Sequence, residues 1–155
     1  MKTLINILKN CKFNSFYKYL FGVLIFISSC VSPPEYSDGL MNNSPAIVNE
    51  IDYFSLSVYG EDFNDSLVWN LELNLSDDDI LLSTLIVKDL NVLSSELSTL
   101  IMTVASGDTI FNVNILDDIT FTSEDSISVI GTPSIISLNV QNFTGRLEYQ
   151  LIKKN

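Results

Sequence analysis

The chain has 155 residues, 46% of them hydrophobic, with 19 acidic and 8 basic side chains, two cysteines and no histidine. The excess of acids disfavours nucleic-acid binding, because contacts between Lys or Arg and phosphate dominate that affinity. The absence of histidine removes Ser-His-Asp and Cys-His catalysis, together with the commonest metal ligand. The hydrophobic content excludes wholesale disorder.

The first feature along the chain is a short apolar run, Tyr19 to Ile27, of nine residues. A transmembrane helix needs about 20 apolar residues, whereas the apolar part of a secretory signal has about 7–15. Two serines follow the run, and small residues of this kind suit a cleavage site. We therefore expect a cleaved signal peptide over residues 1–29. Four basic residues and no acidic residue precede the run: Lys2, Lys9, Lys12 and Lys18.

The end of this signal, Ile27-Ser28-Ser29-Cys30, resembles the lipobox of bacterial lipoproteins, which reads aliphatic, small, small, cysteine. The resemblance implies that the Cys30 thiol receives a diacylglycerol, that residues 1–29 are removed, and that the new amino terminus is acylated. An ordinary secretory signal, or a buried cysteine in a cytosolic protein, is the alternative. The only other cysteine, Cys11, lies within the signal, so no disulfide partner remains after cleavage. Lipidation therefore explains Cys30 better than redox chemistry does.

The residue after Cys30 and the charge of the remaining chain bear on location. Val31, rather than an aspartate, resembles the signal for sorting to the outer membrane. After cleavage, four basic residues face all 19 acidic ones, which leaves a formal charge of −15. Such a charge disfavours contact with anionic lipids and favours cationic partners. We expect a protein that is held on a bacterial outer membrane by its N-terminal lipid. Its domain would bind an envelope protein or an extracellular ligand.

The next segment, residues 30–49, contains three prolines and several serines and asparagines. Residues before proline avoid helical backbone angles, so we expect a lipidated N-terminus followed by an extended, flexible tether. A first strand that begins at Ala46 is the alternative for the end of this segment. The remaining residues, 50–155, are enough for one domain.

From Ile51 onward, apolar and polar residues alternate with a period of two, which is typical of strands with one buried face. Turn-forming residues at 106–108, 123–125, 131–133 and 143–145 separate these segments. Short alternating strands between such turns predict an all-β fold, an antiparallel β-sandwich of immunoglobulin-like or jelly-roll-like type. The residues expected to face the core are Leu67, Trp69, Leu71, Leu73 and Leu75, then Phe111, Val113 and Ile115, then Ile136, Leu138 and Val140, and finally Leu147, Tyr149 and Leu151.

Residues 76–90 are ambiguous. Ser76 and Asp79 have the spacing of a helix capping box, with further acids in what would be the first turn. The following residues are rich in Ile, Thr and Val, and Ile80, Leu82, Thr84 and Ile86 fit a strand. We predict a buried strand, with a helix as the alternative. The next segment is similarly ambiguous up to Glu96 and predicts a strand from Leu100.

Carboxylates are the only chemistry left for a site. Clustered acids could bind calcium through loops at one end of the domain, and the candidates are Asp62, Asp65, Asp77, Asp78 and Asp79. An EF-hand is excluded, because Leu67 and Leu73 occupy the positions that need Gly and Glu. A glycosidase would need two carboxylates across a cleft, and paired acids at strand ends are better explained as solvated turns.

The resulting prediction is a non-enzymatic, lipid-anchored envelope protein, whose polar strand faces and exposed sheet edges bind a partner. A calcium- or carbohydrate-binding module at the cell surface is the alternative.

Overall fold

The computed structural model describes residues 39–91 and 97–154. These residues form seven strands and one helical turn, and no described helix is long and apolar enough to cross a membrane. The elements are β1 (Ala46–Asn49), β2 (Tyr53–Asn70), β3 (Ile80–Asn91), β4 (Ser98–Val104), β5 (Thr109–Ile115), β6 (Ile119–Ser126), α2 (Ile127–Ile130) and β7 (Pro133–Lys154).

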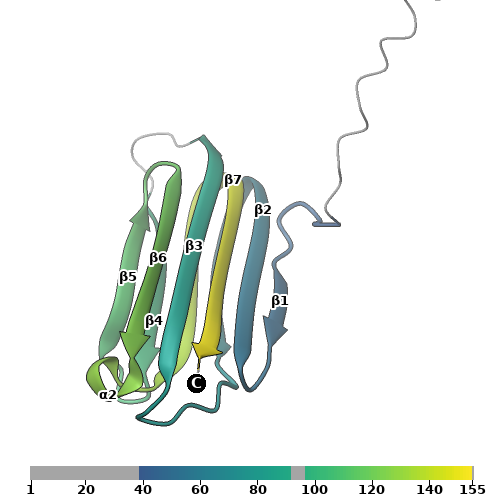
Figure 1. The fold of residues 1–155 in the computed structure, drawn as a ribbon. Helices are drawn as coiled ribbons and strands as arrows, with labels where there is room; N and C mark the ends of the chain where they lie inside the picture. Colours follow the sequence, from purple (N-terminus) through teal and green to yellow (C-terminus); the bar gives the residue numbers. More distant parts are fainter. Residues whose placement is uncertain (1–38, 92–96, 155) are drawn as a thin grey trace, which may run out of the picture. The chain divides into compact units, whose positions relative to one another are not determined.

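All strand pairs are antiparallel, and two long strands organise the sheet. β2 has 18 residues and β7 has 22, and they pair along almost their whole length. The C-terminal part of β7 also pairs with β3, whose other neighbour is β6. The N-terminal part of β7 pairs with β4, whose other neighbour is β5. One sheet therefore has two halves that share β2 and β7, and Figure 1 shows β4 and β5 behind β3 and β6.

β2 and β7 bend where the two halves meet. The register of β2 against β7 shifts between Gly60 and Asp65, opposite residues 140–145. Asp62 and Asn142 have positive φ angles of 50° and 44°, as residues in bulges often do. The turn predicted at 143–145 is therefore wrong. β7 continues through this segment, because β2 carries a matching irregularity and the two strands bend together.

The core lies between the two halves of the sheet. The ring of Tyr149, in the C-terminal part of β7, stacks on Phe111 of β5 with centroids 5.7 Å apart. The Tyr149 hydroxyl donates to the Met102 sulfur of β4 at 3.8 Å. Among the described residues, nineteen buried hydrophobic side chains, Tyr149 and Met102 included, form one cluster, and Phe111 packs against it. Each fully buried aliphatic or aromatic side chain contributes about 1.5–3 kcal/mol, so this core alone accounts for much of the stability.

The antiparallel, all-β prediction is confirmed, and so is most of the predicted core. Every predicted inward residue of β7 is buried, and Phe111, Val113 and Ile115 pack in or against the core. In residues 66–75 the side chains predicted to face the core are buried or packed against it, but the strand ends at Asn70. The turn at 106–108 is present between β4 and β5.

Two open alternatives are also resolved. Residues 80–91 form a strand rather than a helix, and its fully buried apolar residues are Leu81, Leu85 and Val87, one position out of phase with those singled out from the sequence. A first strand does begin at Ala46, where β1 pairs with β2. The turn predicted at 123–125 is wrong, because these residues lie within β6.

Candidate functional site

The sequence-predicted sites fall in separate places. Cys30 and its lipobox lie outside the described residues. Asp62 and Asp65 lie at the bend of β2, where the Asp62 amide donates to the Thr144 hydroxyl at 3.0 Å. Asp77, Asp78 and Asp79 precede β3, and Asp79 contacts Lys153 at the end of β7. Thr144 and Lys153 are nine residues apart on β7, or up to about 30 Å at about 3.3 Å per residue.

The structure therefore does not bring the five candidate calcium ligands together. Within residues 39–91 and 97–154, no group of three or more His, Cys, Asp or Glu side chains is placed to hold a metal ion. The sequence interpretation failed because it assumed that both acidic segments lie at one end of the domain. Asp62 and Asp65 lie at the bend of β2, whereas Asp77, Asp78 and Asp79 lie at the opposite end of the domain, just before β3 begins.

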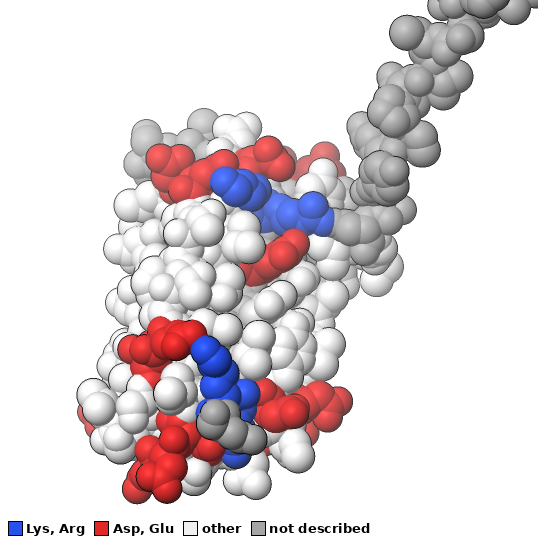
Figure 2. Space-filling model, viewed as in Figure 1, with Lys and Arg blue, Asp and Glu red and all other residues white. Residues whose placement is uncertain are grey.

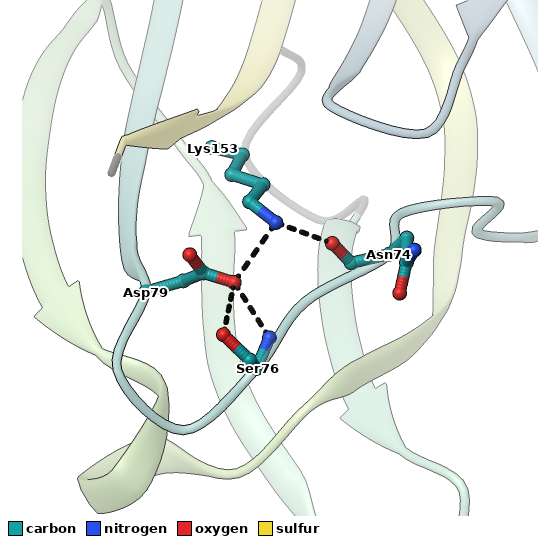
Figure 3. A network of polar contacts seen from close by, with 4 residues as sticks. All are labelled: Asn74, Ser76, Asp79 and Lys153. Atoms are coloured by element: carbon teal, nitrogen blue, oxygen red, sulfur yellow. Dashed lines mark hydrogen bonds and ion pairs between the residues drawn. The ribbon is translucent and has the colours of Figure 1, made fainter.

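Asp79 has a structural use instead. Its Oδ2 accepts hydrogen bonds from the Ser76 amide at 2.6 Å and the Ser76 hydroxyl at 2.8 Å, and lies 3.0 Å from the Lys153 ammonium (Figure 3). Lys153 also donates to the Asn74 carbonyl at 2.8 Å. The Ser76 amide, followed by Lys153 and the Ser76 hydroxyl, lowers the pKa of the Asp79 carboxyl below its usual 3.8. The network ties the connection before β3 to the end of β7.

The charges on the view of Figure 2 gather toward the two ends of the domain, and most of the surface between them is uncharged. Basic residues lie beside acids in both groups. Arg146 lies 3.6 Å from Glu148, and the Lys154 ammonium donates to Glu124. Short surface pairs of this kind add little to stability. These pairs matter for the site because their basic side chains already have acidic partners.

A cavity of about 210 Å³ lies between the two halves of the sheet, on the side of β5 and β6. Among the described strands, β5 pairs only with β4 and β6 only with β3, so this side of the sheet is not closed by hydrogen bonds. Strands β3 to β6 and the turn α2 supply the lining residues, which are Ser83, Met102, Ile110, Phe111, Phe121, Ser123, Asp125 and Ile130.

The register of β6 explains why polar groups reach this cavity. Phe121, Ser123 and Asp125 lie opposite Leu85, Ser83 and Leu81 of β3, all three of which are buried. Residues directly opposite each other in an antiparallel pair share one face of the sheet. Phe121, Ser123 and Asp125 therefore face the interior. An inward carboxylate on an edge strand is unusual, and it is a known device against uncontrolled strand pairing.

The walls of the cavity are aromatic and its polar groups are close together. The rings of Phe111 and Phe121 lie 5.5 Å apart, while the Ser123 hydroxyl donates to Asp125 at 2.8 Å. Burial raises the pKa of the Tyr149 phenol above its usual 10.0, a hydrogen bond with Ser83 opposes the rise, and the charge of Asp125 adds to it. Tyr149 is therefore a neutral hydrogen-bonding group at physiological pH.

The size of the cavity decides what it can hold. Sites for drug-sized ligands have about 300–1,000 Å³, whereas a cavity of about 150 Å³ accommodates a benzene-sized molecule. At about 210 Å³, this cavity suits one side chain or a molecule of similar size. Its aromatic walls and its few clustered hydroxyl and carboxylate groups are of the kind that bind such a side chain or molecule. The alternation of Phe121, Ser123 and Asp125 was the signal in the sequence, but reading 123–125 as a turn concealed it.

Comparison with family models, with characterised proteins and with solved structures finds no match to this chain.

Proposed function

We propose that the protein is a lipid-anchored, non-enzymatic protein of a bacterial outer membrane that binds an envelope partner by strand addition to β6. The lipobox at Cys30 supports the anchor, and the charge of −15 after cleavage supports a domain that is repelled by anionic lipid. We also propose that the two facing halves of the sheet form a β-sandwich, which the ring contact between Phe111 and Tyr149 supports.

The free edge of β6 is the observation that carries this proposal. β6 has eight residues and pairs with β3 along its whole length, while its other edge has no strand partner among the described residues. Such an edge presents a row of unpaired N–H and C=O groups. A peptide that adds to an edge gains affinity from those groups, and pockets for alternate side chains supply specificity.

β6 combines these two requirements better than the other edge strands. β1 has only four residues. β5 has seven residues, and its wall of the cavity carries only apolar side chains. β6 instead places both an aromatic ring and hydrogen-bonding groups at the cavity, on alternate residues. An added strand would have its inward side chains next to these groups.

Position-specific photo-crosslinking in living cells of the native host tests the proposal. The crosslinking residue replaces Thr122, which is exposed in the middle of β6, and in a matched control it replaces Val68, which is 61% exposed on β2. We expect one discrete adduct with an envelope protein from position 122 and none from position 68. The same pattern from both positions, or no adduct from either, would contradict strand addition at β6.

A further inference from the structure

We infer that the strand that binds β6 carries a basic side chain opposite Asp125 and an apolar side chain opposite Phe121, four residues away. This inference rests on the proposed strand addition and specifies the chemistry of the partner. Every strand pair of the sheet is antiparallel, so an added strand is expected to be antiparallel too. The partner segment then has, from its N-terminal end, Lys or Arg opposite Asp125, a small residue opposite Ser123 and an apolar residue opposite Phe121, with any residue at the two positions between them.

The first reason is that Asp125 has no basic partner among the residues that the structure describes. Its only hydrogen bond with another side chain in the described part of the chain is with Ser123, at 2.8 Å, and no ion pair involves it there. Lys153 and Lys154, the basic residues nearest in the sheet, contact Asp79 and Glu124 instead. Asp125 is half-buried beside the cavity, and opposite charges on facing residues of antiparallel strands attract, so a cation from a partner strand would pair with this carboxylate.

The second reason is geometric. Side chains directly opposite each other on antiparallel strands have Cβ atoms about 4.5–5.5 Å apart, which a lysine or arginine spans easily. The residue opposite Phe121 would cover a ring that is 37% exposed and already contacts Phe111 at 5.5 Å. Aromatic and apolar pairs across strands contribute more than Ala–Ala pairs do. Between them, the residue opposite Ser123 would lie beside a single short hydroxyl side chain, where a small residue fits.

The third reason is charge. β6 contains Glu124 and Asp125 and no basic residue, and the chain after Cys30 carries −15. A second copy that added its own β6 would bring four carboxylates into one strand pair, and like charges across strands are destabilising. The inward Asp125 thus disfavours self-association and favours a basic partner.

Peptide binding to the full-length protein in detergent tests the inference directly. The probe is a fluorescent peptide with the core Lys-Thr-Ser-Thr-Phe, measured by anisotropy, together with versions in which Glu replaces Lys or Ser replaces Phe. We expect each change to weaken binding about two- to fivefold, because each removes one of the two cross-strand side-chain contacts. Amide hydrogen exchange should show new protection in alternate residues of β6 when the first peptide is bound.

Two variants of the protein provide the matched comparison. Asp125→Asn removes the inward charge, and Glu124→Gln removes the same charge from the exposed, outward-facing neighbour. We expect Asp125→Asn to weaken binding of the lysine peptide about three- to fivefold and Glu124→Gln to change it less than about twofold. If Asp125→Asn aggregates, the peptide series on the unaltered protein still decides the question.

The possible failures are distinguishable. If no peptide protects β6, both the inference and the proposed strand addition are overturned. If peptides protect β6 but bind equally with Lys or Glu, only the inference is overturned. If the unaltered protein instead forms dimers with protected β6 amides, a second copy is the occupant, and the assignment of a basic partner is wrong.

Discussion

Replacing Gly60 with alanine should destabilise the domain by about 3 kcal/mol. A Cβ on Gly60 would lie 2.4 Å from Cδ1 and 2.6 Å from the carbonyl oxygen of Phe143, where real Cβ contacts stay above 3.0 Å. The Phe143 ring could rotate, but its carbonyl belongs to β7 at the bend, so β2 and β7 would have to separate there. Overpacking costs about 1–3 kcal/mol, and we expect the upper end because side chain and backbone must both move.

Urea unfolding followed by the fluorescence of Trp69, the only tryptophan, measures this change. A loss of about 3 kcal/mol also corresponds to a fall in melting temperature of roughly 12 °C, at about 4 °C per kcal/mol. Gly107→Ala is the control, because an added Cβ there meets no atom within 4 Å and only the φ of +92° opposes it, at about 1 kcal/mol. Equal losses in the two variants would refute the steric argument.

Four further predictions concern other parts of the chain. Asp79→Asn should lower the free energy of unfolding at neutral pH, and the difference from the unaltered protein should vanish on acidification. The pKa of Asp79 is lower in the folded than in the unfolded state, so its charge stabilises the fold above about pH 3.8, and this stabilisation is lost as the pH falls through the folded-state pKa. Urea unfolding at a series of pH values down to about pH 2 measures the difference. Tyr149→Phe should make the free energy of unfolding fall less steeply above about pH 10. The raised pKa of Tyr149 keeps the phenol neutral in the folded state while it ionises in the unfolded state, so alkaline pH favours unfolding of the unaltered protein. Melting curves at alkaline pH check this. Phe121→Ala should cost about 1–2 kcal/mol in urea unfolding, less than a fully buried phenylalanine, because its ring is 37% exposed. Cys30→Ser should abolish incorporation of labelled fatty acid and release the protein from membranes; continued labelling would contradict the anchor.

The period of two was enough to predict the fold class and most of the core. In β7, Leu147, Tyr149 and Leu151 alternate with polar residues, and all three are buried. The pairing of Ser76 with Asp79 was also visible, and the hydrogen bonds between them exist. They close a turn that leads into β3 rather than a helix. A capping pair satisfies local donors in either case, so only the β-branched residues that follow indicated a strand.

The positions of bends and of functional groups could not be predicted in the same way. Residues 143–145 have the composition of a turn, yet they lie within β7 because the bulge at Asp62 of β2 matches them. That match joins residues about 80 apart in sequence, and no local pattern reports it. The same reading of 123–125 as a turn hid the inward orientation of Asp125. Turn composition therefore identified the turn at 106–108 and, at Gly131 and Thr132, the connection between α2 and β7, but not the structure at 123–125 or 143–145.

We propose above all that a lipid anchor at Cys30 presents this domain to its partner in the cell envelope. The intact mass of the protein extracted from membranes of its native host tests that claim most directly. We predict the mass of residues 30–155 plus two or three acyl chains, which would confine the partner of β6 to the cell envelope and its surroundings. A mass equal to residues 30–155 without lipid, or to the whole chain of 155 residues, would contradict the claim.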